Sequence, residues 1–136
     1  MRGMKKHYVI IAVVALVGAV ALWELALTGA SDGAHVSVKV PSLTAAAKRG
    51  ERVFSANCAV CHGKNAAGSN SGPPLVHKIY EPSHHGDGSF ISAVQNGVRQ
   101  HHWSYGNMPR QPNISSRQAG QIITYVRELQ RANGIN

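Results

Sequence analysis

The longest apolar run in the chain lies near its beginning, at residues 8–27, where Glu24 is the only charged side chain. At about 1.5 Å per residue, a helix of this length spans the roughly 30 Å hydrocarbon core of a bilayer. The run therefore predicts one N-terminal transmembrane helix, preceded by a short basic terminus at residues 1–7. A cleaved signal peptide is the alternative, although the apolar core of a signal is usually shorter.

Three later segments show the apolar spacing of amphipathic helices. The first covers residues 44–57, and the second, weaker one covers residues 88–98. The third begins at Ser115 or Ser116, either of which can cap a helix, and ends before Gly134. Its buried stripe is the clearest of the three and comprises Ala119, Ile122, Ile123, Val126 and Leu129. The pattern predicts an all-α domain with three main helices.

The stretches between these helices, residues 63–89 and 99–114, are rich in Gly, Pro, Ser and His. A small domain with so much irregular chain makes little apolar core of its own, so we expect a bulky apolar cofactor. The folded domain is predicted to cover residues 43–136. Residues 28–42 are predicted to be a linker, in which residues 36–40 are extended along the domain or along a partner.

Composition and charge exclude several classes of protein. The 136 residues suffice for one domain, and the net charge is +8 although only 15% of residues are charged. No run of like charges exceeds two residues, which argues against disorder and against a nucleic-acid-binding tail. The only cysteines are Cys58 and Cys61, so a disulfide framework and a four-cysteine zinc site are both excluded.

The strongest chemical signal is Cys58-Ala-Val-Cys61-His62. Cysteines three residues apart on a helical turn present both sulfur atoms to one side, where they can bond the two vinyl groups along one edge of a haem. His62 then presents its imidazole to the iron. A thioredoxin-type redox pair lacks its strand–helix–strand setting here, and a zinc site lacks further ligands at suitable spacing. The motif predicts one covalently bound haem c.

From about Ala45 to Arg131 the chain resembles the class I cytochromes c, in the style of bacterial monohaem proteins. The resemblance rests on the Cys-x-x-Cys-His motif, on Gly72-Pro73-Pro74-Leu75 and on Gly106-Asn107-Met108-Pro109. It implies a small fold of three main helices around one haem. It also implies that the carbonyl of Pro73 accepts the ring N–H of the iron-binding histidine, which fixes the tautomer of that ring.

The same resemblance implies a close contact between the first and last helices of the domain. Gly50 and Phe54 match the glycine and the aromatic residue that the family packs there, and Tyr125 is the expected opposing aromatic residue. These are core positions without a chemical role.

Met108 is predicted to be the sixth ligand of the iron by elimination. Met1 and Met4 precede the apolar segment, so Met108 is the only methionine that the haem can reach. A thioether ligand favours ferrous iron and raises the reduction potential relative to two histidines. His101 or His102 as the ligand, or an open iron site, are the alternatives.

Histidines in the two irregular stretches depart from the common pattern of the family. Such imidazoles could bind copper or zinc, titrate near neutral pH, or form hydrogen bonds with haem propionates and backbone. Whether they bind a second metal stays open at this point. The histidines are His77, His84, His85, His101 and His102, and the further candidates for propionate donors are Arg99, Trp103 and Tyr105.

Together these features predict a one-electron carrier rather than an enzyme. Its expected partners are redox proteins with acidic docking surfaces, and neither nucleic acid nor a small-molecule substrate is expected. A ring of basic residues near the haem-binding segment would steer the encounter. The ring comprises Lys48, Arg49, Arg52 and Lys64.

The basic residues before the apolar run place the N-terminus in the cytoplasm. We therefore expect a single-pass protein of the inner membrane with its haem domain in the periplasm, or a soluble periplasmic protein if the leader is cleaved. A cytochrome subunit of a larger dehydrogenase or oxidase is the alternative function. An open-site haem sensor or peroxidase is a third.

Overall fold

The computed structural model describes residues 13–20, 22–23 and 34–136. The chain divides into two units, at residues 1–32 and 33–136. In the first unit, residues 13–20 and 22–23 are helical. The described residues contain no helix long and apolar enough to cross a membrane. The other parts of the predicted transmembrane segment lie outside the described residues, as does the predicted basic terminus.

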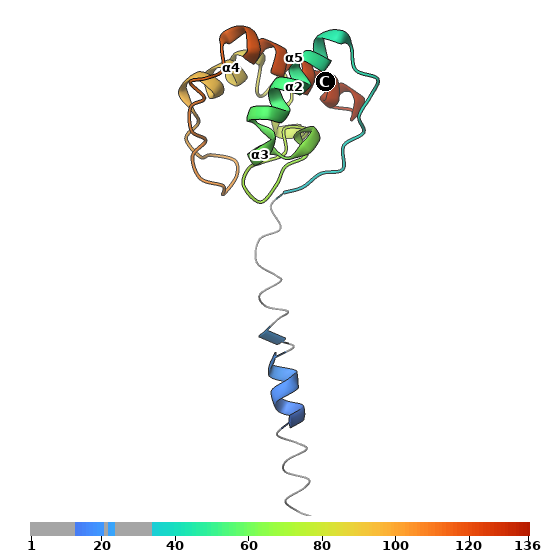
Figure 1. Cartoon of the computed structure of the whole chain (residues 1–136), viewed down its shortest axis with the longest axis vertical. Coiled ribbons are helices and arrows are strands. Elements are labelled where there is room, and N and C mark those ends of the chain that lie inside the picture. Colours follow the sequence, from blue (N-terminus) through green and yellow to red (C-terminus); the bar gives the residue numbers. More distant parts are fainter. Residues whose placement is uncertain (1–12, 21, 24–33) are drawn as a thin grey trace, which may run out of the picture. The chain divides into compact units, whose positions relative to one another are not determined.

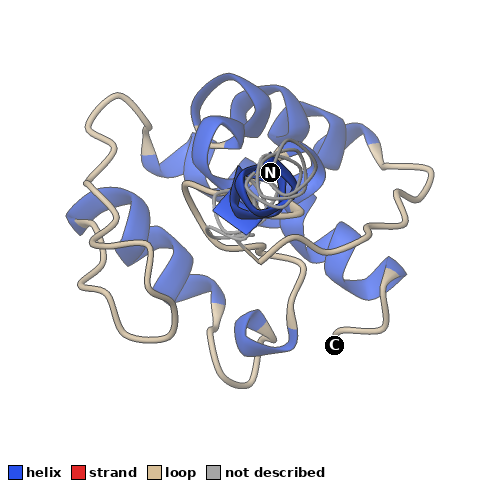
Figure 2. Ribbon diagram, turned by 90° about the horizontal axis from the view of Figure 1, so that it is seen from below, coloured by secondary structure: helices blue, strands red, loops and turns tan. Residues whose placement is uncertain are grey.

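The second unit is helical, as the periodicity predicts (Figure 1). Its described residues contain no strand, only isolated bridges between Ser69 and Gly72 and between Val98 and Met108 (Figure 2). The three main helices are α2 (Ala45–Asn57), α4 (Asp87–Asn96) and α5 (Ser116–Ala132). The short elements are α3 (Ala59–His62) and the 3₁₀ helices η1 (Lys64–Ala66) and η2 (Lys78–Tyr80).

Capping side chains set where the longest helices begin. The hydroxyl of Thr44 accepts the N–H of Ala47 at 3.2 Å, so α2 starts at Ala45. Ser115 caps α5 in a reciprocal capping box with Gln118, which decides between the two serines considered as caps.

Helix α4 ends earlier than the sequence pattern predicts. Gly97 adopts a φ of +78°, which ends the helix after Asn96. Val98 then exchanges backbone hydrogen bonds with Met108, at 2.9 and 3.0 Å. The apolar side chain of Val98 therefore belongs to the start of the next loop rather than to the helix.

Helices α2 and α5 form the main helix pair of the domain (Figure 1). A Cβ atom built on Gly50 would lie only 1.9 Å from the backbone carbonyl oxygen of Gln121, so the backbones approach each other closely there. One turn further along α2, the ring of Phe54 lies 5.5 Å from that of Tyr125. The contact implied by the family resemblance is therefore confirmed.

Residues 34–40, at the start of the second unit, form an extended strap that lies against the rest of that unit. The N–H of Val36 donates to the carbonyl of Ala67 at 2.8 Å, and the N–H of Ala34 donates to the hydroxyl of Tyr105 at 2.5 Å. At the far end, the backbone of Lys39 exchanges two hydrogen bonds with the side chain of Asn133. Of the two locations considered for this segment, the structure has it on the domain itself.

A buried arginine of α5 holds the loop that precedes α4. Arg127 donates to the carbonyl of Tyr80 at 2.7 Å, to the carbonyl of His85 at 2.6 Å and to the carboxylate of Asp87 at 2.8 Å. It also donates to the amide oxygen of Gln130 at 2.6 Å. The side chain thus joins η2, the following loop and the start of α4 to the last helix.

We expect Arg127→Met to destabilise the domain by about 3 kcal/mol, because two backbone carbonyls would lose their charged donor while remaining partly buried. Urea unfolding followed by circular dichroism measures this loss. Arg117→Met is the matched control, since Arg117 is exposed on the same helix and should tolerate the change. Equal stability of the two variants would contradict the role given to Arg127.

Candidate functional site

A cavity of about 670 Å³ opens in the second unit and is large enough to hold a bulky planar cofactor. Four of the five predicted site residues line it, namely Cys58, His62, Pro73 and Met108. Cys61 does not line it and is exposed. Much of the remaining wall is apolar and includes Phe54, Leu75, Phe90, Val94, Val98 and Ile122.

The cysteine motif lies where α2 passes into α3. Cys58 closes α2 with a hydrogen bond to Phe54, and its carbonyl accepts from Cys61 at 3.1 Å and from His62 at 2.9 Å. This tight turn holds the two cysteines and the histidine on one short piece of helix. Burial, and then the neighbouring Cys61, raise the pKa of the Cys58 thiol to about 11. A neutral thiol of this kind differs from the low-pKa thiolate of a dithiol redox centre.

His62 is oriented by a backbone carbonyl. Its Nδ1 lies 2.9 Å from the carbonyl oxygen of Pro73, and because a carbonyl only accepts, Nδ1 carries the proton. Burial lowers the pKa of His62, although the hydrogen bond with Pro73 opposes the shift. The Nε2 lone pair of the neutral ring is therefore left available to an iron ion.

The segment before Pro73 is fitted closely against the cysteine motif. A Cβ atom on Gly72 would lie 2.9 Å from the carbonyl oxygen of Cys61, so a side chain at this position would push the two segments apart. The hydroxyl of Ser69 donates to the same carbonyl at 2.5 Å. These contacts place the carbonyl of Pro73 within reach of His62.

Met108 ends a closed loop on the cavity wall. The bridge between Val98 and Met108 brings the two ends of residues 99–107 together. Inside the loop, the N–H of Gln100 donates to the side chain of Asn107 at 2.9 Å, and the side chain of Gln100 accepts from Gly106 at 2.7 Å. Met108 is thus held at a defined position beside the cavity.

A weakly paired donor in the cavity wall supports the fit of a haem. The indole Nε1 of Trp103 is buried and makes no hydrogen bond of normal geometry, although its N–H lies near the hydroxyl of Tyr80. Burial raises the pKa of Tyr80 to about 12 and outweighs the opposing interaction with Trp103, so the phenol keeps its proton near neutral pH. Buried polar groups normally have partners, and a propionate of a bound haem would supply one to the indole. The residues present therefore fit a haem.

The remaining candidates for propionate donors differ in their surroundings. Arg99 is exposed but lines the cavity. The hydroxyl of Tyr105 accepts from Ala34 of the strap and keeps its own proton to donate. Tyr80 was not foreseen from the sequence, because a single tyrosine in a short 3₁₀ helix carries no periodicity that would mark it.

The five loop histidines separate into two groups. His77 caps η2 by accepting from Ile79 at 3.2 Å, and its ring packs edge-on against Trp103. His84, His85, His101 and His102 lie together, and the ring centroids of neighbouring pairs are 4.4–5.8 Å apart. Desolvation, and then the neighbouring imidazoles, lower the pKa of His102.

Comparison with known proteins agrees with this geometry. A family model for cytochrome c matches residues 47–130, which include the whole cysteine motif and Met108. No curated protein and no solved structure shows significant similarity to the chain. A match over more than half of the sequence assigns the family, and the cysteine pair fits its mode of haem attachment. The chain belongs to the cytochrome c family and carries a haem c bound covalently through Cys58 and Cys61.

Proposed function

We propose that this protein is a one-electron carrier whose single haem iron is bound by His62 and Met108. The observation that carries the proposal is that both residues line one cavity. Nδ1 of His62 is hydrogen-bonded to the carbonyl of Pro73, so Nε2 is available to bind the iron. When bound, the haem supplies an iron that cycles between the ferric and ferrous states. The protein supplies the surroundings that make this cycle fast and reversible.

The residues around the cavity would act by staying in place. Pro73 keeps the ring of His62 in one tautomer and one plane, and the closed loop at residues 99–107 holds the thioether of Met108. The apolar side chains of Phe54 and Leu75 limit the access of water. A site that keeps both ligands in each oxidation state needs little reorganisation when an electron arrives or leaves.

Recognition of redox partners is proposed to use positive charge. Lys48, Arg49, Arg52 and Lys64 are all exposed. Neither salt bridge found among the described residues uses any of them. Free surface charges of one sign raise the encounter rate with an acidic partner in a salt-dependent way.

Location is part of the same proposal and rests on the sequence alone. We propose that the apolar run at residues 8–27 directs export and anchors the protein in the inner membrane, with the haem domain in the periplasm. Cleavage of the leader would give a soluble periplasmic form of the same carrier.

The decisive variant is Met108→Leu, which keeps the volume of the side chain and removes its sulfur. We expect the wild-type holoprotein to show low-spin haem with a methionine-to-iron charge-transfer band in optical and magnetic circular dichroism spectra. The variant should lose this band and have a lower reduction potential, because the soft ligand that favours ferrous iron is gone.

His101→Ala is the matched control, because His101 is a rival ligand from the same loop, is exposed and lies outside the histidine cluster discussed below. It should keep the charge-transfer band. If Met108→Leu keeps the wild-type spectrum while His101→Ala changes it, Met108 is not the sixth ligand of the iron. The proposal of an electron carrier then loses its main support.

A further inference from the structure

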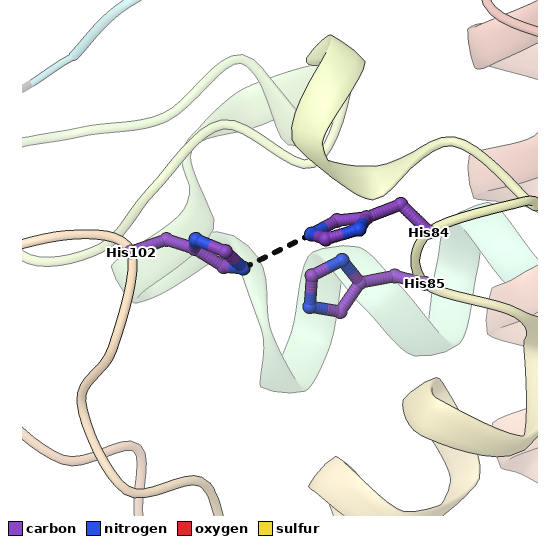
Figure 3. A group of neighbouring side chains, drawn as sticks. All are labelled: His84, His85 and His102. Carbon is purple, nitrogen blue, oxygen red and sulfur yellow. Dashed lines mark hydrogen bonds between the residues drawn. The ribbon is translucent and has the colours of Figure 1, made fainter.

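Three histidines from two separate loops converge on one point beside the haem cavity. His84 and His85 follow η2, and His102 belongs to the loop at residues 99–107 (Figure 3). One ring nitrogen from each lies within 4.8 Å of those of the other two. Nothing in the proposed electron transfer requires this arrangement.

The backbone under the cluster is held from several sides. The N–H groups of His84 and His85 both donate to the carbonyl of Glu81, at 3.1 and 2.8 Å. Arg127 holds the carbonyl of His85 from α5. His102 lies in the loop that the Val98–Met108 bridge closes. The three rings therefore lie on loops that are already held in place, so little backbone ordering is required before they bind one ion.

The hydrogen bonds leave nitrogen lone pairs available to an ion. Nδ1 of His85 lies 2.7 Å from the carbonyl oxygen of Ile79, so this nitrogen is the donor and Nε2 is free to bind. A histidine that donates its second N–H to a backbone carbonyl is the usual form of a metal-binding histidine. His85 thus already has the backbone support that a metal-binding histidine uses.

The spacing of the other pair fits a tetrahedral ion. Nε2 of His84 and Nε2 of His102 are 3.3 Å apart and share a hydrogen bond, whose proton an incoming ion would displace (Figure 3). Two nitrogens that each lie about 2.05 Å from a tetrahedral zinc ion are separated by about 3.3 Å. Imidazole ligands suit zinc and copper, whereas magnesium and calcium prefer oxygen. The nearby carboxylate of Glu81 is paired with Lys78.

We propose that His84, His85 and His102 form a binding site for a divalent transition-metal ion of the zinc and copper class. Three protein ligands leave a fourth position for water. His85 and His102 also line the haem cavity, so the ion would lie at its edge. It would link the loop before α4 to the loop that ends at Met108. The site requires His102 to be free of the haem iron, as it is when Met108 is the sixth ligand, and otherwise depends only on the fold.

The test is calorimetric titration of the untagged holoprotein with Zn²⁺, and separately with Cu²⁺ and Mg²⁺. We expect one Zn²⁺ or Cu²⁺ per chain and no binding of Mg²⁺. His102→Ala and His84→Ala should each weaken Zn²⁺ binding by at least about tenfold, since loss of an outer support alone costs tenfold or more. His35→Ala should bind as the wild type does, because His35 is an exposed histidine outside the cluster.

Thermal unfolding of the holoprotein gives a second readout. Excess Zn²⁺ should raise the midpoint of the wild type and leave that of His84→Ala unchanged, because binding to the folded state alone stabilises it. Wild-type zinc affinity in both cluster variants would overturn the proposal, and so would equal weakening by His35→Ala. Loss of the normal haem spectrum in His84→Ala and His102→Ala would assign the histidines to the haem instead.

Discussion

Replacing Cys58 and Cys61 together by alanine should leave the second unit largely unfolded at 25 °C. Without covalent attachment, the cavity of about 670 Å³ loses the group that fills it. The apolar side chains of its wall would then face water, and at about 1.5–3 kcal/mol for each large side chain the lost burial of several of them is comparable with the whole stability of a typical domain. The loops that line the cavity then lose the surface against which they would pack.

Far-ultraviolet circular dichroism of the purified chain measures this effect. Val60→Ala is the matched control, because Val60 lies between the two cysteines and is 80% exposed. It should bind haem and fold as the wild type does. A cysteine-free chain with native helix content and a cooperative melt in the absence of haem would show that the protein makes its own core.

Gly50→Ala should destabilise the holoprotein by about 3 kcal/mol, the upper part of the range for overpacked cores. The new methyl group would lie 1.9 Å from the carbonyl oxygen of Gln121 and 2.9 Å from Cβ of Tyr125. Neither atom belongs to the flexible end of a side chain. Helices α2 and α5 must therefore move apart, and the contact between Phe54 and Tyr125 must loosen.

The control is Gly120→Ala in α5. Nothing lies within 4 Å of a Cβ atom at this position, so the change should stabilise the helix by up to about 1 kcal/mol. Denaturant unfolding of the two holoproteins compares them directly. If both substitutions shift the midpoint in the same direction, the close approach of the two helices is not the reason that position 50 is glycine.

Local signals along the chain were sufficient to predict the main helices and the haem-binding turn. Thr44 and Ser115 cap the helices that they precede, and the stripe from Ala119 to Leu129 is buried. The end of α4 was predicted two residues too late because apolar spacing continues to Val98. Only the positive φ of Gly97 and the pairing of Val98 with Met108 end the helix there.

Contacts between distant loops could not be predicted in the same way. The sequence shows His84 and His102 as separate loop residues, and the loop before α4 is held by contacts such as that of Arg127 with the carbonyl of His85, 42 residues away. The buried indole N–H of Trp103, which lacks a hydrogen bond of normal geometry, likewise becomes visible only when the loop is folded over the cavity. Such features arise from tertiary packing, which leaves no periodic pattern in the sequence.

The strap has a consequence for how far the haem domain could travel. If residues 8–27 anchor the chain as proposed, the sequence alone offers residues 28–42 as a tether, with a maximum reach of about 50 Å. The hydrogen bonds of Ala34, Val36 and Lys39 bind most of that length to the domain. Only residues 28–33 remain between anchor and strap, and they span at most about 20 Å. Such a short linker would keep the haem close to the membrane surface. Redox partners in the same membrane would then meet it at a high effective concentration, whereas distant partners could not reach it.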